Sequence, residues 1–152
     1  MKILDVLHKE AINPDLKSRT KAEVLDELVV PVARLAGVSR EELVKVLLER
    51  EQLGSTGIGG GIGIPHGKLK DLDHLIIGFG LSRKGVDFES LDGAPTRIFF
   101  LLVTPENSTG LHLKMLARIS RVLKNEPFRE RLLQAGDRDE IYQIVKEEDE
   151  EF

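Results

Sequence analysis

The sequence contains no cysteine, so the chain has no disulfide framework, no thiolate nucleophile and no thiolate ligand for a metal. It also lacks an apolar run close to the roughly 20 residues that a membrane span needs. The first residues lead from Met1 directly to the charged Asp5, without the apolar core of a signal peptide. A formal net charge of −4 argues against a general nucleic-acid-binding protein, which would carry a basic face. These absences together indicate a cytoplasmic protein that neither enters a membrane nor binds nucleic acid.

The size and composition of the chain suit one globular domain. Its 152 residues match the usual domain length of about 100–150 residues. Hydrophobic residues make up 41% of the sequence, which is enough for a core. No internal repeat or linker is visible. We therefore expect a single domain over residues 1–152, with an acidic, solvated and frayed tail from about residue 147.

Apolar residues recur at helical spacing in several segments. The first runs from Lys21 to Gly37, and Pro31 inside it is expected to kink or divide the helix. Ser39 and Glu42 have the spacing of a capping box, which predicts a second helix through about residue 51. Three more helices are expected: one capped by Ser108 or Thr109, one from Asn125 to Gly136, and one from Asp137 to about Glu147.

Short apolar runs between the helices predict strands. Residues 74–82 and 97–104 are two such runs. Ile98 to Val103 is apolar at every position, as in a central strand that is covered on both faces. Residues 86–91 fit either a brief strand or a loop. Helices interleaved with apolar strands predict an α/β sandwich with a largely covered sheet.

One glycine-rich stretch, residues 53–68, stands out from the rest of the chain. Six of the 14 glycines lie between Gly54 and Gly63. Because glycine has no Cβ, such a run lets the backbone adopt positive φ and approach a ligand closely. The even spacing of isoleucines 58, 62 and 64 predicts that they share one face of a strand. Pro65 is expected to end that strand, which would expose His66 in a turn.

Two interpretations fit His66. It is either a turn histidine whose ring is hydrogen-bonded to a backbone carbonyl, or a nucleophilic imidazole that is neutral near pH 7 and carries a transferred group. The glycine-rich backbone beside it offers N–H groups to an anion such as a phosphoryl group. The hydroxyls of Ser55 and Thr56, with the backbone at Gly57, are further candidate ligands of that group.

Two other residues could support such a site. His112 lies in the first turn of a predicted helix, where N–H groups and the helix dipole favour anions, although its apolar neighbours also fit a packed core-edge histidine. Arg50 ends the helix before the glycine run, where it either complements the dipole or binds phosphoryl oxygens with its guanidinium fork. His8 and His74 lie among charged residues and are expected at the surface, and Lys68 is expected to be solvated.

Other ligand-binding motifs fit the sequence poorly. A Walker A loop would end in Gly-Lys-Ser/Thr, whereas here Lys68 follows the histidine without a hydroxyl residue after it. No helical pattern begins directly after the glycines, which argues against a dinucleotide-binding fingerprint. His66, His74 and His112 with Asp71 or Asp73 lack a tight metal-ligand spacing, so no metal or other cofactor is expected.

The segment from Arg50 to Lys68 resembles a known signature. Gly54-Ser-Thr-Gly-Ile-Gly followed by Ile64-Pro-His-Gly-Lys68 is similar to the phosphorylation site of enzyme IIA domains of the bacterial phosphotransferase system, in the fructose/mannitol class that includes nitrogen-regulatory IIA proteins. The similarity continues through residues 99–105 and 112–117 and covers nearly the whole chain. Gly63 stands where alanine is common and Gly60 where a larger polar residue often occurs; neither change removes a reacting group.

The resemblance implies a fold, an activity and partners. The fold would be a mixed, mostly parallel sheet with helices on both faces. His66 would be phosphorylated at Nε2 by an HPr-type carrier protein, with Arg50 and His112 steadying the phosphoryl charge. The chain would then either regulate another protein, such as a potassium transporter or a sensor kinase, or pass the phosphoryl group to the IIB domain of a sugar permease. Because this sequence has no IIB or membrane domain, the regulatory role is favoured.

Overall fold

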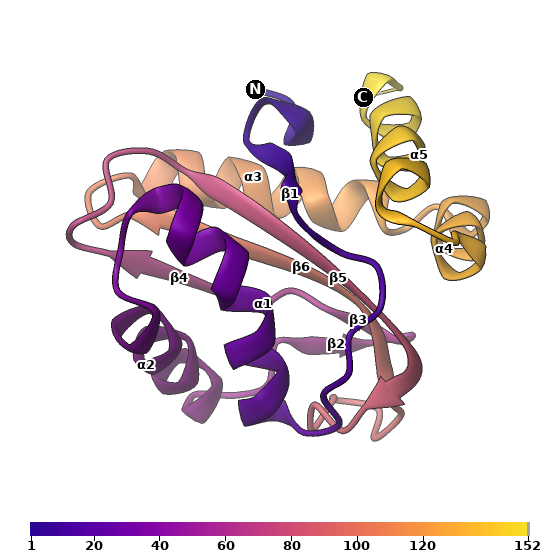
Figure 1. The fold of residues 1–152 in the computed structure, drawn as a ribbon, viewed down its shortest axis with the longest axis horizontal. Helices are drawn as coiled ribbons and strands as arrows, with labels where there is room; N and C mark the ends of the chain where they lie inside the picture. The colour runs from indigo at the N-terminus through magenta and orange to yellow at the C-terminus, as the bar shows by residue number, and fades with distance from the viewer. Residues whose placement is uncertain (152) are drawn as a thin grey trace.

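The computed structural model describes residues 1–151, which form a mixed sheet with α-helices on both faces (Figure 1). The strands are β1 (Leu7–Asn13), β2 (Gly57–Gly59), β3 (Ile62–Gly63), β4 (His66–Leu69), β5 (Ile76–Val86) and β6 (Thr96–Pro105). The helices are α1 (Lys21–Ala36), α2 (Arg40–Gln52), α3 (Thr109–Val122), α4 (Glu126–Gln134) and α5 (Arg138–Glu150), with a short 3₁₀ turn, η1, at Ile3–Asp5.

Strand β6 is the centre of the sheet. The strand order is β1-β5-β6-β3-β2. Strand β4 pairs with β6 on the same edge as β3, but farther along β6 toward its C-terminal end. The pairs β1/β5, β3/β6 and β4/β6 are parallel, whereas β5/β6 and β2/β3 are antiparallel. Every residue from Ile98 to Val103 is buried, as expected for a strand that is covered on both faces. The expected α/β fold with a mixed, covered sheet is confirmed.

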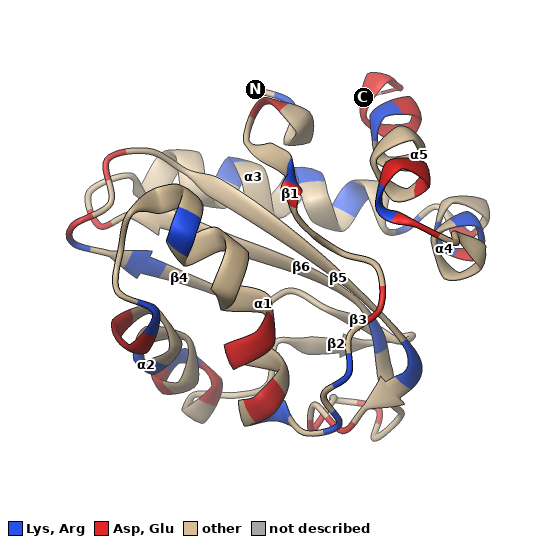
Figure 2. Cartoon of the chain, viewed as in Figure 1, with Lys and Arg blue, Asp and Glu red and all other residues tan. Residues whose placement is uncertain are grey.

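The helices cover both faces of this sheet. Helices α1 and α2 lie on the face toward the viewer in Figure 1, where α1 packs against β5 and α2 against β4. Helix α3 lies behind the sheet and contacts β6. The charged residues gather on the helices and loops and are sparse on the central strands (Figure 2), as expected when both faces are covered by apolar packing.

Helix α1 contains Pro31 but is not divided by it. A proline inside a helix removes one backbone hydrogen bond and strains the turn before it. The apolar residues of α1 that face the sheet are buried on both sides of this proline: Val24, Leu25, Leu28, Val29, Val32 and Ala33. Burial of this apolar face therefore offsets the free-energy cost of the proline within the helix. The helix ends where expected, at Gly37, whose φ of 68° is left-handed.

The glycine run forms a small hairpin instead of one strand. The turn between β2 and β3 passes through Gly60 and Gly61, whose φ angles are 67° and 79°. Because the chain reverses there, the prediction that isoleucines 58, 62 and 64 share one face is wrong. Ile62 and Ile64 are buried, whereas Ile58 is 49% exposed.

The strand ends before Pro65, as predicted, but a new strand, β4, begins directly after the proline and continues along β6 in the same register. Ile62 pairs with Ile98 before the proline, and His66 pairs with Leu102 after it. Pro65 lacks an N–H donor, but its carbonyl oxygen still accepts a hydrogen bond from the Leu102 N–H at 3.0 Å. His66 is therefore the first residue of a strand and does not lie in a turn.

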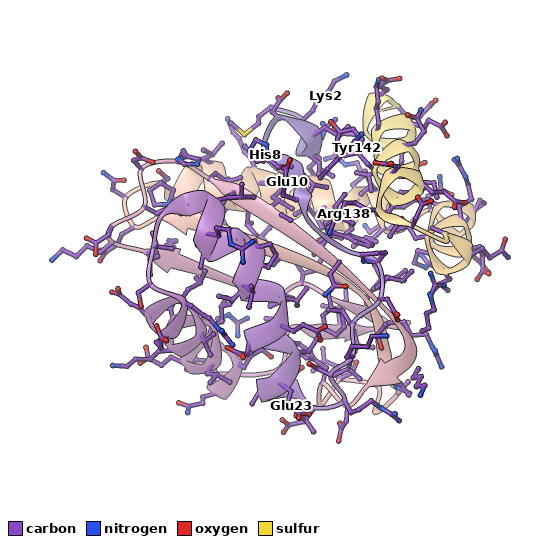
Figure 3. The ribbon with its side chains drawn as sticks, viewed as in Figure 1. Lys2, His8, Glu10, Glu23, Arg138 and Tyr142 are labelled. Atoms are coloured by element: carbon purple, nitrogen blue, oxygen red, sulfur yellow. The ribbon has the colours of Figure 1, made fainter. Side chains whose placement is uncertain are left out.

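Residues 147–150 complete α5, which packs against β1 and η1, so the expectation of a frayed tail from residue 147 is wrong for these residues; residue 152 lies outside the described part of the chain. Figure 3 shows Arg138 and Tyr142 on the side of α5 that faces β1, and the Arg138 Nε donates to the Ile12 carbonyl at 3.0 Å. Near the end of α5, the side chain of Asp149 is 1% exposed. It accepts hydrogen bonds from the Arg118 Nε at 2.8 Å and from the Leu4 N–H at 3.1 Å.

Replacing Asp149 tests whether the acidic end belongs to the fold. Asp149→Ala removes the carboxylate that holds Arg118 of α3 and the Leu4 backbone, and breaking a buried ion pair is costly. We expect the free energy of unfolding to fall by about 2–4 kcal/mol in urea titrations. The exposed Glu150→Ala is the matched control, with a change within about 0.5 kcal/mol. Equal stability of both variants would show that the docking contributes nothing.

Candidate functional site

His66 is fixed by a hydrogen bond to its own chain. Its Nδ1 lies 2.8 Å from the carbonyl oxygen of Ile64. A carbonyl oxygen only accepts, so Nδ1 carries the proton of the neutral ring. Nε2 then has a free lone pair. The interpretation of a ring hydrogen-bonded to a backbone carbonyl is therefore confirmed, and the nucleophilic role of the free Nε2 stays a prediction.

The surroundings keep the His66 ring neutral. Burial lowers its pKa below the usual 6.5, and the positive charge of Arg50 lowers it further. The bond to Ile64 and the negative charge of Glu51 act in the opposite direction, but burial is the largest effect. A pKa below the usual 6.5 means that the imidazole is mainly unprotonated at pH 7.

His112 lies beside His66, on the first turn of α3. The two ring centroids are 5.4 Å apart, with a tilt of 57° between the planes. The ring of His112 is buried, and its Nδ1 lies 2.7 Å from the hydroxyl oxygen of Thr104 at the end of β6. Burial lowers the pKa of His112 to about 4, with further lowering by His66 and Lys68. His112 is thus a neutral hydrogen-bonding group at pH 7.

Arg50 reaches the site from the last turn of α2. Its Nη1 donates to the carbonyl oxygen of Gly54 at 3.0 Å, and its charge acts on His66. Helix α2 can lie this close to β4 because residue 67 is a glycine. A Cβ at Gly67 would lie only 2.9 Å from the Cγ1 of Val46. Arg50, His66 and His112 come from three different elements, α2, β4 and α3. The structure places all three in one site, as the sequence predicted.

The donors of the loop before β2 are engaged within the protein. The Ser55 hydroxyl donates to the Phe88 carbonyl at 2.9 Å and accepts from the Gly57 N–H at 3.0 Å. The Thr56 hydroxyl and N–H both donate to the carboxylate of Glu51. Ser55, Thr56 and Gly57 therefore shape the loop, and their contact with a phosphoryl group stays a prediction.

Glu51 and Lys21 are residues of this region that the sequence reasoning missed. The side chain of Glu51 is 3% exposed, and Lys21 Nζ lies 3.0 Å from its Oε1. The sequence held a signal for Glu51, because it follows Leu43 and Leu47 at intervals of four and so lies on the buried face of α2. A carboxylate on an apolar face predicts a buried partner.

The segment from Phe88 to Asp92 is a second missed feature. It holds the glycine hairpin through hydrogen bonds to the backbone of two glycines. Gly57 O accepts from the Leu91 N–H at 3.0 Å and from the Ser90 hydroxyl at 3.1 Å, and the Gly60 N–H donates to Asp92 at 3.0 Å. Within residues 1–151, Glu89 is the one non-glycine residue with positive φ, at 54°. The segment is a loop that is hydrogen-bonded to the hairpin. Hydrophobic periodicity predicts helices and strands, so it gave no sign of this contact.

The remaining candidate residues lie away from this site or at its edge. His8 and His74 are exposed, as predicted. Lys68, expected to be solvated, donates from Nζ to the Thr109 hydroxyl at 2.9 Å. Across residues 1–151 no group of three His, Asp or Glu side chains is arranged to hold a metal ion. None of the helices in the same range is long and apolar enough to span a bilayer.

Comparison with protein-family models gives a match over residues 5–148, to the family described as phosphoenolpyruvate-dependent sugar phosphotransferase system, EIIA 2. The chain belongs to this family. It is therefore a phosphotransfer component of the phosphotransferase system, and the resemblance stated from the sequence is confirmed.

Named relatives fall into two groups. The nitrogen regulatory protein of Bradyrhizobium diazoefficiens is 41% identical over 145 residues, which cover 95% of each chain. The fructose-specific EIIABC component of Bacillus subtilis is 38% identical over 150 residues, and the match covers 98% of this chain but 24% of that larger protein. The crystal structure of nitrogen regulatory protein IIA-Ntr from Neisseria meningitidis superposes with a TM-score of 0.87, at 30% identity and covering 93% and 97% of the two chains.

The lowered pKa of His112 predicts a pH-dependent loss of stability. A group with a folded-state pKa of about 4 and an unfolded value near 6.5 stays neutral in the folded protein while the unfolded chain takes up a proton. The free energy of unfolding should therefore fall as the pH decreases from about 6.5 to about 4. Urea unfolding across this range should show a shallower fall in His112→Gln than in the unsubstituted protein. Parallel curves would contradict a buried, neutral His112.

Proposed function

We propose that this protein is a phosphocarrier that accepts a phosphoryl group on His66 Nε2 from an HPr-type protein. The observation that carries the proposal is the bond from His66 Nδ1 to the Ile64 carbonyl, which leaves Nε2 as the nucleophilic nitrogen. Membership of the EIIA 2 family supports the same reaction.

In the proposed step, the Nε2 lone pair attacks the phosphorus of the donor's phosphohistidine. A new P–N bond forms as the donor's P–N bond breaks, and the electron pair returns to the donor imidazole. His66 keeps its Nδ1 proton, so the phosphorylated ring is an imidazolium whose charge is stabilised by the Ile64 carbonyl dipole. The requirements are positioning and charge complementarity, and no nucleotide or metal is needed.

Arg50 and His112 would stabilise the phosphoryl oxygens. The Arg50 guanidinium lies close enough for its charge to act on His66 and offers donors to an oxyanion. A Thr104 hydroxyl that donates to His112 Nδ1 leaves the proton of the neutral ring on Nε2, which can donate to a phosphoryl oxygen. Because His112 is uncharged at pH 7, the grip on the phosphoryl group stays moderate and onward transfer is not blocked.

The proposed output is regulatory. The likeness to a nitrogen regulatory protein over 95% of both chains supports a role in which phosphorylation of His66 changes binding to a regulated protein, such as a transporter or a sensor kinase. The alternative is transfer to a sugar-permease IIB domain, supported by the likeness to a fructose-specific EIIABC component. Either role suits a cytoplasmic protein.

Phosphorylation of His66 is tested by intact-mass spectrometry after mixing the protein with phosphoenolpyruvate, enzyme I and HPr. We expect one acid-labile phosphoryl group on the unsubstituted protein and none on His66→Ala. His74→Ala, which removes an exposed histidine, is the matched control and should be labelled normally. Labelling of His66→Ala would refute the site assignment.

Arg50 is tested by the rate of transfer. Arg50→Ala removes the cation beside the acceptor and should slow labelling by about 100-fold, as the loss of one transition-state contact does. Arg50→Lys should recover only part of the rate, because an ammonium lacks the planar fork. The exposed Lys45→Ala on the same helix is the control. An unchanged rate in Arg50→Ala would exclude a role in transfer.

The two outputs are separated by offering the phosphorylated protein to a fructose-type IIB domain with its acceptor cysteine. Under the regulatory role we expect the phosphohistidine to persist for at least as long as without IIB. Rapid transfer to the cysteine, at a rate comparable to labelling by HPr, would instead establish the transport role.

A further inference from the structure

Three hydrogen-bonded steps, joined through the backbone of Thr56 and Ile64, connect the buried carboxylate of Glu51 to the ring of His66. Glu51 Oε1 accepts from the Thr56 N–H at 3.0 Å, and its other oxygen accepts from the Thr56 hydroxyl. The Thr56 carbonyl accepts from the Ile64 N–H at 3.0 Å. The Ile64 carbonyl in turn accepts from His66 Nδ1 at 2.8 Å. Each group in this series is held by the group before it.

The carboxylate at the start of the series is itself fixed. It is buried, and the ammonium of Lys21, from the first turn of α1, lies 3.0 Å from Oε1. Lys21 is only 13% exposed and also lies 5.0 Å from the centre of the Phe88 ring. A buried carboxylate is tolerated when it has a cation and several donors, and here it has all of these.

Resting on the function proposed above, we infer that Glu51 is a positioning residue for His66, acting through the peptides of Thr56 and Ile64, with Lys21 as its counter-ion. Glu51 touches neither the donor nor the phosphoryl group. It holds Thr56, whose carbonyl binds the Ile64 N–H, and so restrains residue Ile64 on the N-terminal side of the carbonyl that faces the imidazole. The Ile64 carbonyl then keeps the ring proton on Nδ1, which leaves Nε2 free for attack.

Arg50 and Glu51 are neighbours on α2, and they would act on His66 from the solvent side and from the protein interior, respectively. Arg50 is partly exposed and acts on His66 from the solvent side, whereas Glu51 points into the protein. Successive residues of a helix are about 100° apart, so neighbours necessarily face different surroundings.

The experiment measures the tautomer of His66 in the unphosphorylated protein by ¹⁵N NMR of the imidazole, and the labelling rate with phosphorylated HPr. Glu51→Ala should lose the preference for the Nδ1 proton and slow labelling by about 10- to 100-fold, the effect of a misplaced reacting atom. Glu51→Gln keeps an acceptor for the Thr56 N–H and should retain the tautomer, with a rate within about threefold. Glu49→Ala removes an exposed carboxylate from the same helix and should change neither.

A wild-type tautomer and rate in folded Glu51→Ala would overturn the proposal. If Glu51→Ala does not fold, Thr56→Val decides: it removes one anchor while keeping the peptide, and should slow labelling about threefold to tenfold with a partial tautomer shift. An unchanged tautomer in Thr56→Val would also overturn it. Because the tautomer is read without phosphorylation, a protein that HPr does not label would refute the proposed function and still leave this positioning decided.

Discussion

The hydrogen bond from His66 Nδ1 to the Ile64 carbonyl sets the chemistry of the site, and much of the surrounding structure serves to maintain it. A neutral imidazole has one donor and one acceptor nitrogen, so fixing the donor also fixes which nitrogen keeps its lone pair. The carbonyl of Ile64 can hold its direction because β3 and β4 share one register along β6 on either side of Pro65. Pro65, which has no N–H to donate, directly follows this carbonyl, and its own carbonyl accepts from the Leu102 N–H.

Charges of opposite sign act on His66 and partly cancel one another. Arg50 and burial lower the pKa of His66, and Glu51 raises it. Lys21 offsets the charge of Glu51 at 3.0 Å. Under the proposed function the protein must accept a phosphoryl group and release it again, and the Arg50 cation with a neutral His112 would bind that group without trapping it. The ion pair of Lys21 and Glu51 fixes the Thr56 backbone and has no net charge.

Much of the fold was readable from local patterns. The all-apolar run from Ile98 to Val103 identified the central strand, and Gly37 correctly marked the end of α1. The failures have a common cause. The turn at His66 and the frayed acidic end of α5 were both judged from local propensity, and in both cases contacts with distant parts of the chain prevailed. For Asp149, those contacts are Arg118 on α3 and the backbone of Leu4 at the other end of the chain.

By itself, the sequence determined which residue types are available for chemistry and where the helices and buried strands lie, because these depend on composition and on spacing along the chain. It also carried the signature at Ile64 to Lys68 that identifies the family. Only the tertiary structure decided that His112 lies 5.4 Å from His66, and that Glu51 faces inward to Lys21 and Thr56. Distances between residues far apart in the sequence depend on how β6 brings β4, α3 and the α2 helix together, and no local pattern contains that information.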